Sequence, residues 1–233
     1  ASDSQEQGAL AFNNEGVAQM NAKNYHSAAE SFNRAVGLQP DYATAFYNLG
    51  TAYFHLQKYE KSIRALEKAV ALHDAFAEAF NQLGVVYVET NQYEKAVAVL
   101  EKANRLKPNN PVALYNLGCA YIRLQNYRAA IEKLEKAKRL DADNPEIRFN
   151  LGFALSRRNR FDEAVAEMRK AVSLNPKDEE SQVLLCRIYL LNNDRSAALA
   201  QYSAVKSLNP QLAEKLFQTI YKEKIISVSG TQN

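Results

Sequence analysis

The most reactive side chains in this sequence are three histidines and two cysteines, His26, His55, His73, Cys119 and Cys186. A histidine can act as a general base and a cysteine as a nucleophile if the fold brings them together with a third, orienting group. Their spacing gives no metal-ligand pattern. The sequence also has no P-loop, dinucleotide-binding glycine pattern, nucleophile elbow or His-Glu-x-x-His helix. We therefore predict no catalytic residue, no metal site, no cofactor and no enzymatic activity.

Basic side chains are concentrated in one part of the chain. Residues 111–178 contain 13 Lys and Arg against 9 Asp and Glu, a net charge of +4, whereas the whole chain carries +3. The densest part of this region is Arg157, Arg158 and Arg160. Two interpretations stay open at this stage: a solvated turn and helix surface, or a site for an acidic or phosphorylated segment of a partner.

The overall composition is typical of a globular chain, with 233 residues, 47% hydrophobic and 24% charged. The 29 basic and 26 acidic residues are too evenly balanced to indicate a nucleic-acid partner. No apolar run reaches the roughly 20 residues needed to cross a bilayer, so membrane insertion is not expected. A cytoplasmic location is favoured, and a periplasmic or secreted one stays open if Ala1 is a processed N-terminus.

The glycines and prolines reveal an internal repeat. Five glycines follow one another at intervals of 34 residues, and the next step falls on Cys186; they are Gly16, Gly50, Gly84, Gly118 and Gly152. All six prolines lie in two columns of the same period, Pro40, Pro108, Pro176 and Pro210 in one and Pro111 and Pro145 in the other. Such regularity is typical of a solenoid protein built from stacked units.

Each unit contains two apolar patterns of helical period, separated by a polar pair such as Lys23-Asn24 or Gln57-Lys58. Proline or an Asx residue then ends the second helix. We predict twelve helices of about 14 residues and a thirteenth after Pro210. A glycine inside a helix costs about 1 kcal/mol relative to alanine. Something must offset that cost, and we expect it to be the close approach of the second helix.

The stretch from Phe46 to Tyr53, with Tyr59, Ser62 and Leu66 after it, resembles the tetratricopeptide repeat family, whose units are 34-residue helix pairs. The resemblance implies an all-α fold, a right-handed superhelical solenoid in which the first helix of each pair lines a concave face. It divides the chain into a flexible tail over 1–8, six repeats over 9–42, 43–76, 77–110, 111–144, 145–178 and 179–212, a capping helix over 211–226 and a flexible tail over 227–233. Arg148 and Gln182 depart from the family pattern, because earlier units have an aromatic residue or Leu at that position.

The side of each first helix that faces away from the core should be mostly polar if it met only water. It contains many apolar residues instead. Three columns carry this surface, at three residues before the glycine and at one and four residues after it; they include Tyr47, Tyr115, Phe149, Phe153, Phe54 and Ile122. A continuous apolar surface of this kind usually marks an interaction site. For the column four residues after the glycine, packing between neighbouring repeats is an equally good explanation.

Between these columns runs a column of amides: Asn14, Asn48, Gln82, Asn116 and Asn150. A side-chain amide offers both a donor and an acceptor, so it can satisfy the backbone of a peptide whatever its sequence. The column resembles the asparagine ladder that lines the superhelical domain of O-linked N-acetylglucosamine transferase. Gln82 departs from this ladder, and Leu184 replaces its sixth rung.

We therefore expect a protein-binding scaffold that holds an extended or partly helical peptide in its concave groove. The residues expected to bind the peptide are the five amides, the aromatic residues Tyr47, Tyr115, Phe149 and Phe153, and, toward an acidic group of the ligand, Arg123 and Arg157. Two alternatives stay open. The chain could instead self-assemble into a homo-oligomer, or serve as the targeting arm of a larger enzyme or complex.

Overall fold

The structure is a computed structural model that describes residues 3–218. The residues in this range form helices joined by short turns, with no strand among them. The helices are α1 (Asp3–Asn21), α2 (Tyr25–Leu38), α3 (Ala43–His55), α4 (Tyr59–Leu72), α5 (Ala77–Glu89), α6 (Tyr93–Leu106), α7 (Pro111–Arg123), α8 (Tyr127–Leu140), α9 (Pro145–Ser156), α10 (Phe161–Leu174), α11 (Glu179–Leu191) and α12 (Arg195–Leu208). Residues 210–218 form a further helical segment. Across this range, none of the helices is both long and apolar enough to span a membrane.

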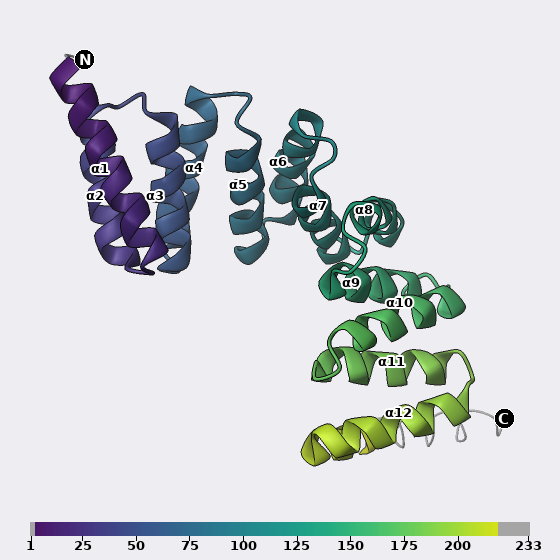
Figure 1. Cartoon of the computed structure of the whole chain (residues 1–233). Coiled ribbons are helices and arrows are strands. Elements are labelled where there is room, and N and C mark those ends of the chain that lie inside the picture. Colours follow the sequence, from purple (N-terminus) through teal and green to yellow (C-terminus); the bar gives the residue numbers. More distant parts are fainter. Residues whose placement is uncertain (1–2, 219–233) are drawn as a thin grey trace. The chain divides into compact units, whose positions relative to one another are not determined.

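The chain divides after Asn126 into two compact units. Unit 1 contains α1 to α7, and unit 2 contains α8 to α12 and the helical segment 210–218. Within each unit, consecutive helices pack against each other as antiparallel neighbours joined by short turns (Figure 1). The predicted all-α class of stacked helix pairs is thus confirmed.

Every turn inside a helix pair contains a non-glycine residue with a left-handed backbone conformation. These residues have φ between 56° and 59° and follow one another at 34-residue intervals; they are Lys23, Gln57, Asn91, Gln125, Asn159 and Asn193. In the second repeat, the Gln57 amide donates to the Phe54 carbonyl at 2.8 Å and the Lys58 amide donates to the Tyr53 carbonyl at 2.9 Å. These two hydrogen bonds form the Schellman motif. The motif gives partners to backbone carbonyls that have none within the last turn of the first helix. The polar pairs seen in the sequence therefore end the first helix by this motif.

The two proline columns act at opposite ends of helices. Pro40, Pro108 and Pro176 come two residues after α2, α6 and α10, where a helix cannot continue. In contrast, Pro111 and Pro145 are the first residues of α7 and α9, where the missing amide hydrogen costs nothing. The residues before them, Asn110 and Asn144, cap these helices by accepting hydrogen bonds from two backbone amides each.

The glycine column allows the two helices of a pair to approach closely. A Cβ atom added at Gly16 would lie 2.5 Å from the Phe32 ring, and one at Gly50 would lie 2.6 Å from Cγ of Leu66. Both distances are far below normal van der Waals contact, so the space of the missing side chain is filled by the second helix. The same relation links Gly152 to Met168, 2.7 Å from its Cγ. The close approach expected from the sequence is confirmed at these positions.

Hydrogen bonds between repeats supplement the apolar core. The phenol of Tyr87 donates to Glu67 at 2.7 Å, and that of Tyr121 donates to Glu101 at 2.6 Å, in each case across to the preceding repeat. Burial raises the pKa of Tyr87, and the hydrogen bond to the Glu67 carboxylate raises it further. The tyrosines three residues after the glycine thus fill the core with their rings and connect repeats with their hydroxyl groups.

Arg148 departs from the repeat pattern because it belongs to an ion-pair network in unit 2. Its Nη1 lies 2.8 Å from Oε2 of Glu167, and the Nζ of Lys138 lies 2.6 Å from Oε1 of the same carboxylate. The side chains of Arg148 and Glu167 are each only 15% exposed. One carboxylate therefore connects three helices, α8, α9 and α10.

Gln182 takes the corresponding position one repeat later and is buried. Its Nε2 donates to the Pro176 carbonyl at 2.8 Å, and its Oε1 accepts a hydrogen bond from Gln201. Arg148 and Gln182 thus make polar contacts at the position that Phe46 and Phe80 occupy in earlier repeats.

The ends of the chain differ partly from expectation. Residues 3–8, expected to belong to a flexible tail, are part of α1, so that expectation is wrong for them. Ala213 and Leu216 pack against Cys186, Ala198 and Val205, and so cover the last helix pair. The rest of the predicted capping helix, 219–226, and the predicted tail, 227–233, lie outside the described residues.

Candidate functional site

The histidines and cysteines do not assemble into a reactive site. Among residues 3–218, no group of three or more His, Cys, Asp or Glu side chains could hold a metal ion. His55 stacks on the Tyr25 ring with a centroid distance of 4.5 Å. Neither Cys119 nor Cys186 forms a disulfide, and burial raises the pKa of the Cys186 thiol to about 11. A thiol with such a pKa is a poor nucleophile at neutral pH.

The amides of the predicted ladder form hydrogen bonds between repeats in unit 1. Nδ2 of Asn48 donates to Oδ1 of Asn13 at 2.9 Å, and Nδ2 of Asn116 donates to Oδ1 of Asn81 at 3.0 Å. The two partners are 35 residues apart in both pairs. An amide expected to hold a ligand backbone is therefore already engaged with the neighbouring repeat through one of its N–H groups.

The residue 35 positions earlier differs from one amide of the ladder to the next. Gln82 has Tyr47 at that position and makes no such amide pair, and Leu184 has the apolar Phe149 there. In unit 2, Nδ2 of Asn150 donates to the Glu146 carbonyl one turn earlier at 3.0 Å. Asn14, in the first repeat, is exposed. The rungs are therefore not equivalent, which the type of residue in one column could not reveal.

The two arginines expected to meet an acidic ligand stack on aromatic rings. The guanidinium carbon of Arg123 lies 5.5 Å from the centroid of Tyr93, and that of Arg157 lies 5.4 Å from the centroid of Tyr127. Nε of Arg157 also donates to the Tyr127 hydroxyl at 3.2 Å. These are cation–π contacts between neighbouring repeats. A spacing of 30 residues, which also separates Tyr25 from His55, is the sequence signal that could have found them.

Much of the apolar face in unit 1 packs between repeats. The Tyr47 ring lies 5.1 Å from that of Phe76, and its pKa is raised, mainly by burial. Tyr47, Phe54 and Val88 all pack against the buried cluster around Leu83. Of the two explanations for the column four residues after the glycine, packing between repeats therefore holds for Phe54 and Val88. Tyr115 is half-buried on α7.

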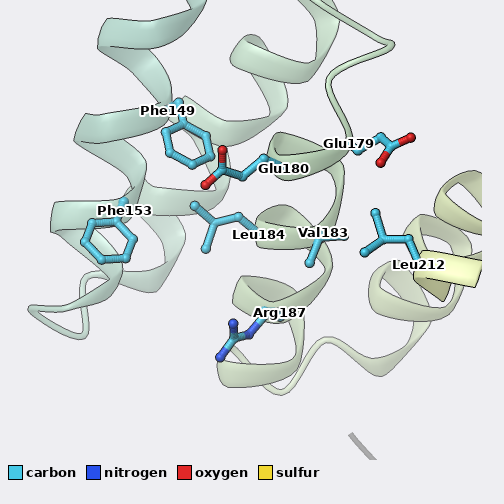
Figure 2. A pocket seen from close by; sticks show the side chains of 8 residues that line it. All are labelled: Phe149, Phe153, Glu179, Glu180, Val183, Leu184, Arg187 and Leu212. Atoms are coloured by element: carbon cyan, nitrogen blue, oxygen red, sulfur yellow. The ribbon is translucent and has the colours of Figure 1, made fainter. Parts of the chain in front are cut away.

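Unit 2 differs, because its apolar face is hollowed into a groove. The pocket has a volume of about 410 Å³ and lies between α9 and α11, next to the helical segment 210–218 (Figure 2). Eight residues line it: Phe149, Phe153, Glu179, Glu180, Val183, Leu184, Arg187 and Leu212. We call these residues the unit 2 groove. Two of the predicted binding residues, Phe149 and Phe153, are brought together here.

The unit 2 groove has an apolar floor and charged ends. Figure 2 shows Phe149 and Phe153 along α9, facing Leu184 of α11, with Val183 toward Leu212. Glu179 and Glu180 lie in the first turn of α11, and Arg187 lies two turns further along the same helix. The sequence columns contained Val183, Leu184 and Arg187, but only the packing of α9, α11 and Leu212 shows that they share a pocket. Glu179, Glu180 and Leu212 were missed.

Comparisons with known proteins agree with this architecture. Three family models match the chain, described as TPR repeat (residues 84–125), tetratricopeptide repeat (residues 13–73 and 115–179) and a further tetratricopeptide repeat model (residues 155–216). None of the curated proteins compared with the chain matches it.

Solved structures show the same fold. YrrB, described as a TPR protein with an unusual peptide-binding site, is 24% identical, with 82% of this chain and 99% of that chain covered and a TM-score of 0.71. The PilF protein of Pseudomonas aeruginosa is 21% identical, with coverages of 93% and 99% and a TM-score of 0.79. MamA from Desulfovibrio magneticus is 22% identical, with coverages of 72% and 96% and a TM-score of 0.69. With its 34-residue helix pairs and family models that match more than half of its length, the chain belongs to the tetratricopeptide repeat family.

Proposed function

We propose that this protein is a non-catalytic interaction scaffold that binds a peptide segment of a partner protein in the unit 2 groove. The observation that carries the proposal is the groove itself, with Phe149, Phe153, Val183 and Leu184 as its floor. Its volume, about 410 Å³, lies in the range of roughly 300 to 1,000 Å³ that is usual for ligand pockets. Aromatic side chains in a pocket are typical anchors of protein interfaces.

The family supports this proposal at a coarser level, since neighbouring structures include a protein described as having a peptide-binding site. The fold alone does not specify a ligand, because one fold can carry many functions. The proposal therefore depends on the groove residues. The amide column of unit 1 is a separate candidate surface: Asn14 is exposed, and Gln82 has no amide partner in the preceding repeat, so both can still bind a peptide backbone.

An affinity capture from the native source tests the proposal with three forms of the chain. The wild type is compared with the double variant Phe149→Ala, Phe153→Ala, and with the control Leu199→Ala. Leu199 is 67% exposed on α12 and does not line the groove, so the control removes an apolar surface side chain of the same unit. Circular dichroism checks that all three are folded.

We expect a set of partners that the wild type and Leu199→Ala capture equally and the groove variant loses. A partner that all three forms capture equally would show that the unit 2 groove is not its binding site. A synthetic peptide from the captured partner, titrated by calorimetry, then determines whether one segment is sufficient for binding.

Self-association is a second candidate, favoured by exposed apolar side chains on α1. Leu10 is 51% exposed and Val17 is 38% exposed on this helix. Light scattering over a concentration series distinguishes the two, because a self-associating chain shows a molar mass that rises with concentration. The double variant Leu10→Ser, Val17→Ser would then lower the mass, whereas the Phe149→Ala, Phe153→Ala variant would not.

A further inference from the structure

One face of α11 carries a stripe of two apolar residues with a charged residue at each end. Glu180, Val183, Leu184 and Arg187 stand at positions i, i+3, i+4 and i+7, which places them on one side of a helix. Glu180 and Arg187 are exposed, and in the part of the chain described here neither makes a hydrogen bond or an ion pair. Two opposite charges therefore flank an apolar pair, with nothing to neutralise them.

The geometry of the unit 2 groove matches a helical ligand. Glu180 and Arg187 are seven residues apart, which is about 10.5 Å along a helix that rises about 1.5 Å per residue. Opposite them, Phe149 and Phe153 stand at i and i+4 on α9, so they too share one helix face. A third, amphipathic helix can bind in a groove between two such helices. Its side chains at positions i, i+3, i+4 and i+7 would make the contacts.

The charges define the direction of such a helix. A ligand helix antiparallel to α11 would place its N-terminal half near Arg187 and its C-terminal half near Glu180, because Glu180 lies in the first turn of α11. An acidic residue would then lie toward the ligand N-terminus and a basic residue toward its C-terminus, and both positions are favourable in the field of a helix dipole. The dipoles of α11 and the ligand would also oppose each other. A parallel ligand would need the reverse charge order and would lose both effects.

We propose that the unit 2 groove binds an amphipathic helix of a partner protein, antiparallel to α11, with an acidic residue at i, apolar residues at i+3 and i+4, and a basic residue at i+7. The acidic residue pairs with Arg187, the basic residue with Glu180, and the apolar residues contact Val183, Leu184 and the two phenylalanines. This inference rests on the proposed function and specifies the ligand of the same groove.

Two labelled alanine-rich helical peptides of about 18 residues serve as probes, a length at which isolated helices begin to be stable in water. The first has Glu at i, Leu at i+3 and i+4, and Lys at i+7; the second has the Glu and Lys exchanged. Fluorescence anisotropy measures both against the full chain. The exchanged peptide meets two repulsions in the antiparallel orientation and loses both helix-dipole effects in the parallel one, so we expect the first peptide to bind at least about fivefold more tightly. About 0.5 M salt should reduce this preference, since exposed pairs are screened.

A charge-reversed chain, Glu180→Lys with Arg187→Glu, should prefer the second peptide instead. Both residues are exposed, so the variant is expected to fold. The single variant Arg187→Gln is a second test, because it should lose part of the preference for the first peptide. An unchanged preference in either variant, or no binding of either peptide to the wild type, would overturn the inference.

The two proposals fail in different ways. If the Phe149→Ala, Phe153→Ala chain loses a captured partner while the charge-reversed chain keeps it with unchanged affinity, the groove is a binding site but the charge arrangement is not its determinant. If neither variant loses any partner, the proposed function itself is wrong.

Discussion

A Cβ atom at Gly84 would lie 2.4 Å from Cγ of Leu100, on the helix that pairs with α5. Helix propensity alone predicts that Gly84→Ala gains about 1 kcal/mol, because alanine is the better helix former. The contact predicts the opposite, since overpacking a close interface typically costs about 1 to 3 kcal/mol. We expect the contact to dominate, because Leu100 is fully buried and cannot move aside, and we expect chemical denaturation to show a lower free energy of unfolding.

Gly37 provides the matched control. It lies in the last turn of a helix, α2, where an added Cβ would meet no atom within 4 Å. Gly37→Ala should therefore raise the free energy of unfolding by up to about 1 kcal/mol. A shift of both variants in the same direction would refute the packing explanation.

The left-handed turn residues predict a gain of stability from glycine. Gln57 has φ of 56°, a conformation that costs a residue with a Cβ about 1 kcal/mol and costs glycine very little. We expect Gln57→Gly to raise the free energy of unfolding by about 0.5 kcal/mol after the greater freedom of glycine in the unfolded chain is counted. Gln57→Val should lower it by at least about 1 kcal/mol, because a branched side chain is strained in this conformation. Thermal unfolding of the two variants gives the comparison, and equal melting temperatures would contradict it.

The thiol of Cys186 should react slowly and with a characteristic pH dependence. Its pKa of about 11 leaves roughly 0.1% as thiolate at pH 8, against about a quarter for an unperturbed cysteine. In the variant Cys119→Ser, which keeps Cys186 alone, we expect alkylation to be at least about 100-fold slower than in the unfolded chain. Because the folded pKa lies above the range measured, the rate should rise about tenfold per pH unit between pH 7 and 9.5. A plateau near pH 8.5 in the folded chain would show that the thiol is not shielded.

The carboxylate of Glu167 should contribute more than either of its cations. Glu167→Ala leaves both Lys138 and Arg148 without their partner in a partly buried place, and we expect a loss of roughly 1.5 to 3 kcal/mol. Arg148→Leu restores the residue type of Leu114 in the preceding repeat and leaves Lys138 paired with Glu167, so it should cost less than about 1.5 kcal/mol. Urea titrations of the two variants and of the double variant give the coupling energy. Equal losses in both single variants would show that the network is not centred on Glu167.

The fold could be predicted from the sequence because every repeat contains the same signals for the start, the end and the packing of its helices. Glycines every 34 residues, polar pairs such as Gln57-Lys58 and the proline columns act within one helix pair, so a one-dimensional pattern contains them. The expected tail over residues 3–8 was wrong because that stretch has no proline, and its one glycine, Gly8, does not interrupt α1.

The binding surface could be predicted only in part from the sequence. The columns indicated an apolar face, but a column does not say whether a side chain packs against the core, as Phe54 does, or lines a groove, as Phe149 does. Likewise, the amide of Asn116 is engaged by Asn81, a residue of another repeat whose type varies from unit to unit.

The sequence by itself thus determined the repeat and the helix pairs, since these depend on local backbone preferences and on spacing within about 34 residues. Only the tertiary structure decided where the apolar face becomes a groove. In unit 2, Phe149 and Phe153 of α9 lie across from Val183 and Leu184 of α11, and Leu212 closes one side. That arrangement depends on the distance between helices of different repeats, which is set by all the side chains packed between them and not by any single column.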